Sequence, residues 1–276
     1  MDDLSYLRFN ADFSAPHIVR AYDEVSLWSA LFGLFLLDEV PLDARTVLDV
    51  GCGTGFPLIE LAERLGPAAH VHGIDPWSAG LVRAREKIAD RGTPNVTVHE
   101  GSATAMNFPD ATFDLIVSNL GINNFSDRAG AMRECRRVAR TGAILALTTN
   151  LQGHMQELYD AFGQTLENLG DRDGLHRLAA HVGERATVAS VTELMTGGGF
   201  AVRRVALRSA TMRFRDGRAL FHHHFIQLGF LDAWKRIPSD QGSAFTALQR
   251  RLDELAHERG ELRLTIPMAY LESVAG

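Results

Sequence analysis

Between residues 46 and 150, short runs of apolar and β-branched residues alternate with longer stretches whose apolar residues recur at helical spacing. Strands that alternate in this way with helices are typical of βα units. We therefore predict a mostly parallel sheet with helices on both faces. The predicted strands are TVLDV (46–50), HVHGID (70–75), NVTVHE (95–100), FDLIVSN (113–119) and AILALTT (143–149), and the predicted helices between them are 57–65, 79–91 and 127–140.

The second half of the chain is less regular. A helix is predicted at 155–169, and a shorter one at 187–200 ends at three successive glycines. Residues 200–214 resemble a long edge strand. Helical spacing predicts helices over 219–237 and 243–259, and a last strand over 261–273, where Pro267 suits an edge or a bulge better than the centre of a sheet.

These elements predict one α/β core with helical additions. We expect a helical cap at 1–44, a core at 45–214 and 261–276, and a helical insertion at 215–260, because two adjacent edge strands need only a short hairpin. The apolar stretch 27–37 is about half the length needed to span a bilayer, so we expect a buried helix there. The N-terminus lacks the pattern of a signal peptide.

The stretch VLDVGCGTGFP (47–57) places three glycines at alternate positions directly after a predicted strand. Such a turn points backbone N–H groups and a helix N-terminus at a ligand, at the edge of the sheet where open α/β folds bind ligands. The spacing is not G-x-G-x-x-G, because Phe56 or Leu58 stands where the third glycine of a dinucleotide site would fall. A phosphate-binding P-loop is excluded too, because no Gly-Lys-Ser/Thr follows.

The spacing G-x-G-x-G after LDV resembles the first motif of class I S-adenosylmethionine-dependent methyltransferases, and further segments resemble the same family in order. They are HGIDPW, EGSATAMNFPDATFDLIVSN and RECRRVARTGAILALTT, so the resemblance covers residues 45 to 150. It is closest to small-molecule, type 11-like members. The resemblance implies a Rossmann-like fold with a seven-stranded, mostly parallel sheet, and S-adenosyl-L-methionine as the methyl donor.

The resemblance also implies a set of cofactor contacts. Asp75 would accept the ribose hydroxyls, and Trp77 is either a face against the adenine or an ordinary packed aromatic. The family often has an acidic residue for the adenine amine where this chain has Ser102, which weakens that contact. Cys52 is interpreted as a small packed residue. The implied cofactor-binding residues are Asp49, Gly51, Gly53, Gly55, Asp75, Pro76, Trp77, Ser102, Ala103 and Asn119.

The methyl acceptor is predicted to be a small molecule. The motif [DNS]-P-P-[YFW] of enzymes that methylate base or glutamine amides is absent, since Asn119 is followed by Leu-Gly-Ile. Candidate general bases are His224, which helical spacing places on the buried face of 219–237 with His223 more exposed, and His154. Ordinary core packing is the alternative for both histidines, and we expect no metal site at the three successive histidines.

Composition narrows the class of partner. The net charge of −6 argues against a nucleic-acid partner. Two cysteines cannot form a disulfide framework, so we expect a cytoplasmic protein with reduced thiols. We also expect no membrane partner. The apolar residues of 215–260 fit either a pocket wall or a homodimer interface. Two other functions stay open at this point: a non-catalytic protein that binds S-adenosylmethionine or a nucleotide, and a dinucleotide-dependent oxidoreductase.

Overall fold

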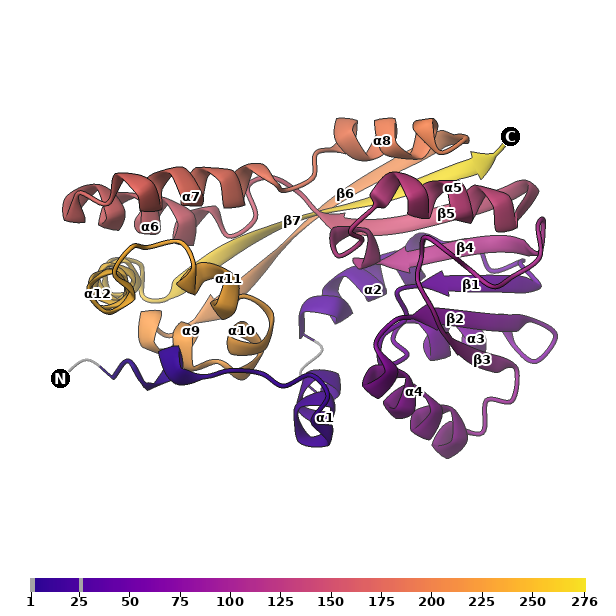
Figure 1. Cartoon of the computed structure of the whole chain (residues 1–276), viewed down its shortest axis with the longest axis horizontal. Coiled ribbons are helices and arrows are strands. Elements are labelled where there is room, and N and C mark those ends of the chain that lie inside the picture. The colour runs from indigo at the N-terminus through magenta and orange to yellow at the C-terminus, as the bar shows by residue number, and fades with distance from the viewer. Residues whose placement is uncertain (1–2, 25–26) are drawn as a thin grey trace. The chain divides into compact units, whose positions relative to one another are not determined.

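The computed structural model describes residues 3–24 and 27–276. Its central feature is a sheet of seven strands, drawn as arrows in Figure 1. The strand order is β3-β2-β1-β4-β5-β7-β6. Helices cover both faces of this sheet, as the sequence predicts. The strands are β1 (Thr46–Val50), β2 (His70–Asp75), β3 (Val96–Glu100), β4 (Phe113–Asn119), β5 (Ala139–Asn150), β6 (Phe200–Phe214) and β7 (Leu262–Ala275).

The five strands β3-β2-β1-β4-β5 run parallel to one another. The central strands β1 and β4 are almost entirely buried, as expected for strands covered on both faces: six of the seven residues of β4 are buried. The edge strand β3 is only partly buried. The chain passes outward from β1 to β3 and then returns to the other side of β1 with β4. The carboxyl ends of β1 and β4 therefore form a topological switch point, where open α/β sheets bind ligands.

The chain divides into two compact units. The sheet unit comprises Phe13–Thr149, Ala186–Arg208 and Met268–Gly276, and the helical unit comprises Met1–Asp12, Asn150–Arg185 and Ser209–Pro267. Strands β6 and β7 contribute residues to both. Helices of the sheet unit are α1 (Pro16–Glu24), α2 (Leu27–Glu39), α3 (Leu58–Leu65), α4 (Ser78–Arg91), the 3₁₀ turn η2 (Gly121–Asn123), α5 (Arg128–Val138) and α8 (Val188–Gly197).

The helical unit is built around aromatic side chains. Trp234, Phe221, Phe245 and Phe162 are fully buried, and Tyr6 stacks on Phe221 with 5.0 Å between ring centroids. Large buried rings of this kind supply most of the apolar area that holds short helices together. The elements are η1 (Ser5–Arg8), α6 (Gln156–Leu169), α7 (Arg172–Gly183), α9 (Gly217–His222), α10 (His224–Gly229), α11 (Leu231–Lys235) and α12 (Gln241–Arg259).

These units differ from the domain boundaries expected from the sequence. Residues 13–44 of the expected N-terminal cap group with the sheet, and residues 150–185 of the expected core group with the helical unit. Residues 1–2 and 25–26 of that cap lie outside the described part of the chain. Helix α2 forms where the apolar stretch 27–37 predicts it, and no helix among the described residues is long and apolar enough to cross a membrane.

Two sequence predictions about the last third of the chain were wrong. The segment 219–237 is three short helices, because the backbone of His223 is extended (φ −68°, ψ 123°) and ends α9. Strand β7 is not an edge strand, since it lies between β5 and β6. Pro267 has no N–H to donate, but its carbonyl accepts from the N–H of Leu151, which already lies beyond the end of β5. Helix α7 was not predicted.

Candidate functional site

The glycine turn that follows β1 is docked on the neighbouring strand. The N–H groups of Gly51 and Cys52 both donate to the carbonyl of Ile74 in β2, at 2.8 and 3.3 Å. Gly51, Gly53 and Gly55 have φ values of +85°, +50° and +94°, which other residues rarely adopt. No atom lies within 4 Å of the position that a Cβ on Gly53 would take. The turn therefore presents bare backbone to open space at the switch point.

Asp75, the last residue of β2, fixes this turn. One carboxylate oxygen accepts from the N–H of Gly53 at 2.9 Å, and the other accepts from the N–H of Trp77 at 2.8 Å. The side chain is 9% exposed, and each oxygen keeps a further lone pair. Asp75 thus joins the glycine turn to the start of α4 and retains acceptor capacity for a ligand hydroxyl.

Asp49 is a buried carboxylate without a hydrogen-bond partner among the described residues. It is 0% exposed, and neither oxygen has a protein partner. Burial, together with the charge of Asp75, raises the pKa of Asp49 to about 8. A buried, unpaired acid of this kind costs free energy unless a cation or donor compensates it. The environment of Asp49 therefore favours a cationic ligand group next to the glycine turn.

The segment from Phe13 through α1 covers the same region of the sheet unit. The rings of Phe13, Tyr22 and Trp77 contact one another edge-on, with centroids 5.3 to 6.1 Å apart. Burial and the charge of Asp75 raise the pKa of the Tyr22 hydroxyl. Nothing in the sequence links these N-terminal aromatics to Trp77, which lies two residues beyond Asp75.

Ion pairs hold α1 in this position. Asp23 pairs with Arg83 at 2.9 Å and with Lys87, both in α4, and its carboxylate also accepts from the hydroxyl of Thr54 in the glycine turn. These partners hold the pKa of Asp23 below its ordinary value despite the burial that opposes the shift. One carboxylate thereby links α1, α4 and the turn.

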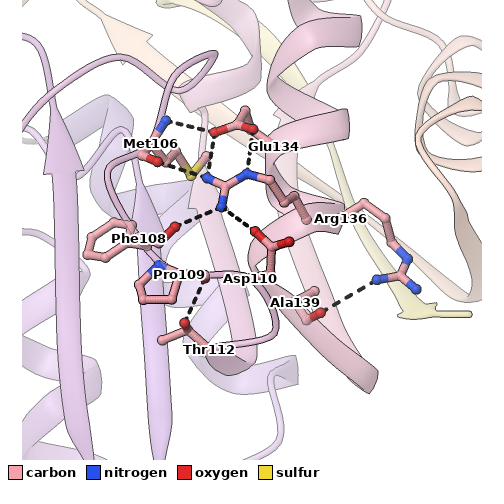
Figure 2. A network of polar contacts seen from close by, with 9 residues as sticks. Met106, Phe108, Pro109, Asp110, Thr112, Glu134, Arg136 and Ala139 are labelled. Atoms are coloured by element: carbon pink, nitrogen blue, oxygen red, sulfur yellow. Dashed lines mark hydrogen bonds and ion pairs between the residues drawn. The ribbon is translucent and has the colours of Figure 1, made fainter.

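The connection between β3 and β4 carries Ser102 and is held by a single arginine of α5. The Arg137 guanidinium donates to the carbonyls of Met106 and Phe108 at 2.8 and 2.7 Å, to Asp110 at 2.8 Å and to both oxygens of Glu134. Glu134 in turn accepts from the N–H of Met106 at 2.8 Å. Figure 2 labels Met106, Phe108, Asp110 and Glu134, which lie around these contacts.

This network predicts a loss of stability when Arg137 is replaced. Arg137→Met leaves the Glu134 carboxylate and two carbonyls without their charged partner, so we expect the free energy of unfolding to fall by about 2 kcal/mol. Urea denaturation measures this change. Arg133→Met is the matched control, because Arg133 lies in the same helix, is 68% exposed and has one ion pair at 3.7 Å. Equal losses in the two variants would contradict the assignment.

Two other residues predicted to bind the cofactor, Ser102 and Asn119, make hydrogen bonds within the protein. The Ser102 hydroxyl contacts that of Thr104 at 2.8 Å. The Asn119 side chain donates to the carbonyl of Ser29 in α2 at 3.0 Å and accepts from Thr148 of β5 at 2.8 Å. Asn119 therefore ties α2 and β5 to the end of β4.

The turn after β4 packs directly on the glycine turn. A side chain on Gly121 would come within 2.5 Å of the Ser118 hydroxyl and 2.7 Å of the Val50 carbonyl, so only glycine allows this close approach. The preceding Leu120 has a φ of +63°, a costly conformation for a leucine. Leu120 and Gly121 together place η2 beside Gly51. A Cβ atom added to Gly51 would lie only 3.2 Å from the Cα of Gly121.

The histidines proposed as bases belong to the helical unit. His154 is 2% exposed, and its burial together with the charge of Arg185 lowers the pKa of the imidazole to about 3. Such a pKa makes it a weak proton acceptor at neutral pH. His224 is half-buried like His223, contrary to the predicted contrast, and contacts the ring of Phe9 edge-on. No cluster of three or more metal-ligating side chains occurs among the described residues.

Cys52 is packed as a filler. Its side chain is 2% exposed, and burial followed by the charges of Asp49 and Asp75 raises the pKa of the thiol well above its ordinary value. A Cβ on Gly73 would meet its sulfur at 2.7 Å, so the two residues fit closely together. A protonated thiol in this position is a poor nucleophile.

Comparison with known proteins decides the family. The model of the family described as "Methyltransferase domain" matches residues 42–201, more than half of the chain. The chain belongs to this methyltransferase domain family. It is 38% identical over 119 residues to the demethylmenaquinone methyltransferase of Anoxybacillus flavithermus, a match that covers 42% of this chain and 50% of the relative. The chain thus spans about half the length of the curated relatives it matches.

Solved structures agree with the fold of this methyltransferase family. An S-adenosylmethionine-dependent methyltransferase from Aquifex aeolicus is 25% identical, with a TM-score of 0.55 over 70% of this chain and 92% of that one. Phosphoethanolamine N-methyltransferase 2 of Haemonchus contortus, solved with S-adenosyl-L-methionine, has a TM-score of 0.56 over 96% of this chain and 60% of that one at 15% identity, which shows the fold alone. The cofactor of the family is S-adenosyl-L-methionine.

The residues of this methyltransferase domain fit that cofactor. The methionyl part of the cofactor carries an ammonium group, whose positive charge would compensate the unpaired carboxylate of Asp49. The open space next to Gly53 leaves room for a ligand at the turn. Asp75 retains lone pairs for ribose hydroxyls. The individual contacts stay predictions.

The buried carboxyl of Asp49 should make ligand binding depend on pH. Its pKa of about 8 leaves the carboxyl protonated at pH 7 without ligand, whereas a neighbouring ammonium group favours the ionised form. Binding of S-adenosylhomocysteine should therefore release close to one proton at pH 7. Affinity should rise with pH, by up to about tenfold per unit, and level off above about pH 8.

Calorimetry in two buffers of different ionisation enthalpy measures the released proton. Asp49→Asn, which cannot ionise, should abolish the release and weaken binding. Identical heats for the unmodified protein in both buffers at pH 7 would show that Asp49 does not meet the ligand's charge. The folded protein alone should lose stability as pH rises from about 4 to 8, because the unfolded chain ionises Asp49 first.

Proposed function

We propose that this protein is an S-adenosylmethionine-dependent methyltransferase that acts on a small-molecule acceptor. The observation that carries the proposal is the arrangement at the switch point. A glycine turn faces open space, a buried Asp49 lacks a partner among the described residues, and Asp75 fixes the turn while keeping free lone pairs. Each feature suits a different part of the cofactor: the backbone approach, the ammonium group and the ribose.

The chain's own residues would supply binding and alignment. When bound, S-adenosylmethionine supplies an activated methyl group, which an acceptor atom attacks in line. Residues of the glycine turn and Asp75 hold the donor end, while the Phe13–Tyr22–Trp77 aromatics exclude water from it. An acceptor that carries a proton also needs a base. His224 stays a candidate base, and the low pKa of His154 makes it the weaker one.

Three observations support a small-molecule acceptor. The turn after β4 contains Asn119-Leu120-Gly121 in place of the motif used on amides, and the net charge is −6. The curated relatives are named demethylmenaquinone methyltransferases. The same relatives favour an enzyme over a non-catalytic binding protein.

Ligand-induced thermal stabilisation tests this proposal. We expect S-adenosylhomocysteine to raise the melting temperature, because a ligand that binds only the folded state stabilises it by mass action. NAD(H) and NADP(H) serve as controls and should cause no shift. A shift with the dinucleotides alone would overturn the proposal and favour the oxidoreductase.

A further inference from the structure

A groove of about 200 Å³ opens in the sheet unit where η2, the start of α5 and α8 meet. Its apolar lining is Ile122, Ala186, Val191 and Leu194, of which Ile122 and Val191 are buried. Its polar lining is Asn123, Arg128 and Ser190. The volume suits a ligand of one or two rings with a substituent, and it is too small for a polymer.

Arg128 differs from the other arginines of α5. Arg133 pairs with Asp127, Arg136 donates to the carbonyl of Gly276, and Arg137 is held by Glu134 and Asp110. Arg128 has no acidic partner within the described part of the chain. Its guanidinium makes one long contact, 3.5 Å to the carbonyl of Asn123, which leaves most of its N–H groups available.

The groove adjoins the proposed cofactor site through a single turn. Gly121 packs against Gly51 of the glycine turn, while the next two residues of η2, Ile122 and Asn123, line the groove. The amide oxygen of Asn123 also accepts from the Thr149 hydroxyl in β5 at 2.6 Å, which fixes this wall. A ligand in the groove would therefore lie against the same short turn as the methyl donor.

We propose that this groove binds the methyl acceptor and that Arg128 selects acceptors bearing a carboxylate. The planar guanidinium offers two parallel N–H donors, which match a carboxylate, and the apolar lining residues receive the body of the ligand. The acceptor class is therefore an apolar ring or short chain with one carboxylate. This inference rests on the proposed function and adds to it a specificity residue.

Binding of simple carboxylates tests the groove. The probes are 2-naphthoate and benzoate, each compared with its uncharged amide, and the protein is saturated with S-adenosylhomocysteine and ¹³C-labelled at Ile, Leu and Val methyl groups. We expect the carboxylates to shift the methyl signals of Ile122, Val191 and Leu194 and to bind at least about tenfold more tightly than the amides, from the strength of a charge-assisted pair.

Arg128→Gln should remove this preference and leave the affinity for S-adenosylhomocysteine unchanged. Arg133→Gln, in the same helix, is the matched control and should keep the preference. No methyl shifts with any probe, equal binding of carboxylate and amide, or an unaltered preference in Arg128→Gln would overturn the inference. Failure of the proposed function looks different, since the unmodified protein would then fail to bind S-adenosylhomocysteine at all.

Discussion

Gly53→Val is expected to abolish the binding of S-adenosylhomocysteine without unfolding the protein. The space beyond the Cα of Gly53 holds no protein atom within 4 Å, so the valine side chain would meet the ligand and not the core. It would occupy the volume into which the methionyl part of the cofactor must fit. Calorimetry should show no binding heat, while circular dichroism should keep its helix and strand signals.

Backbone strain needs its own control, because Gly53 has a φ of +50° and a branched residue is disfavoured there. Gly92→Val is this control. Gly92 follows the last residue of α4 and has a φ of +62°, and no atom lies within 4 Å of the position that a Cβ on Gly92 would take. Both variants should lose similar stability, and only Gly53→Val should lose the ligand. Normal affinity in Gly53→Val would place the cofactor elsewhere.

The strands around the glycine turn could be predicted because each one is a short run rich in apolar residues in the sequence. Strands β1, β2 and β4 begin and end where the sequence pattern places them, since parallel strands covered on both faces need continuous apolar runs. Asp49 and Asp75 could be assigned to the carboxyl ends of their strands for the same reason. The unpaired state of Asp49 could not be predicted, because it depends on every element packed around it.

Contacts between distant segments were beyond sequence reasoning. Trp77 donates to the carbonyl of Phe13, and Arg137 reaches Phe108, although nothing in the spacing of these residues links them. The helices of 219–237 were misassigned because apolar spacing cannot detect the extended His223 that separates α9 from α10. The start of β5 was placed late, at 143, because Thr141-Gly142 resembles a turn, whereas the strand begins at Ala139 with an irregular register against β4.

Asp75→Ala is expected to weaken S-adenosylhomocysteine binding by at least about 2 kcal/mol, or about 30-fold in the dissociation constant. The carboxylate would contribute charge-assisted bonds to the ribose hydroxyls. It also accepts from the N–H groups of Gly53 and Trp77, so its loss releases the turn that must approach the ligand. Both effects act in the same direction, which makes this the largest expected loss from a single polar side chain at the site.

Glu100→Ala is the matched control for Asp75→Ala. Glu100 ends the adjacent strand β3 in register with Asp75, but its carboxylate is exposed and accepts from the Ser78 hydroxyl at 2.6 Å. Its removal should leave affinity nearly unchanged. Asp75→Asn separates the two contributions, because the amide keeps one acceptor oxygen and presents an N–H₂ group to the second backbone donor. An affinity loss near zero in Asp75→Ala would show that neither a ribose contact of Asp75 nor its hold on the turn contributes to binding.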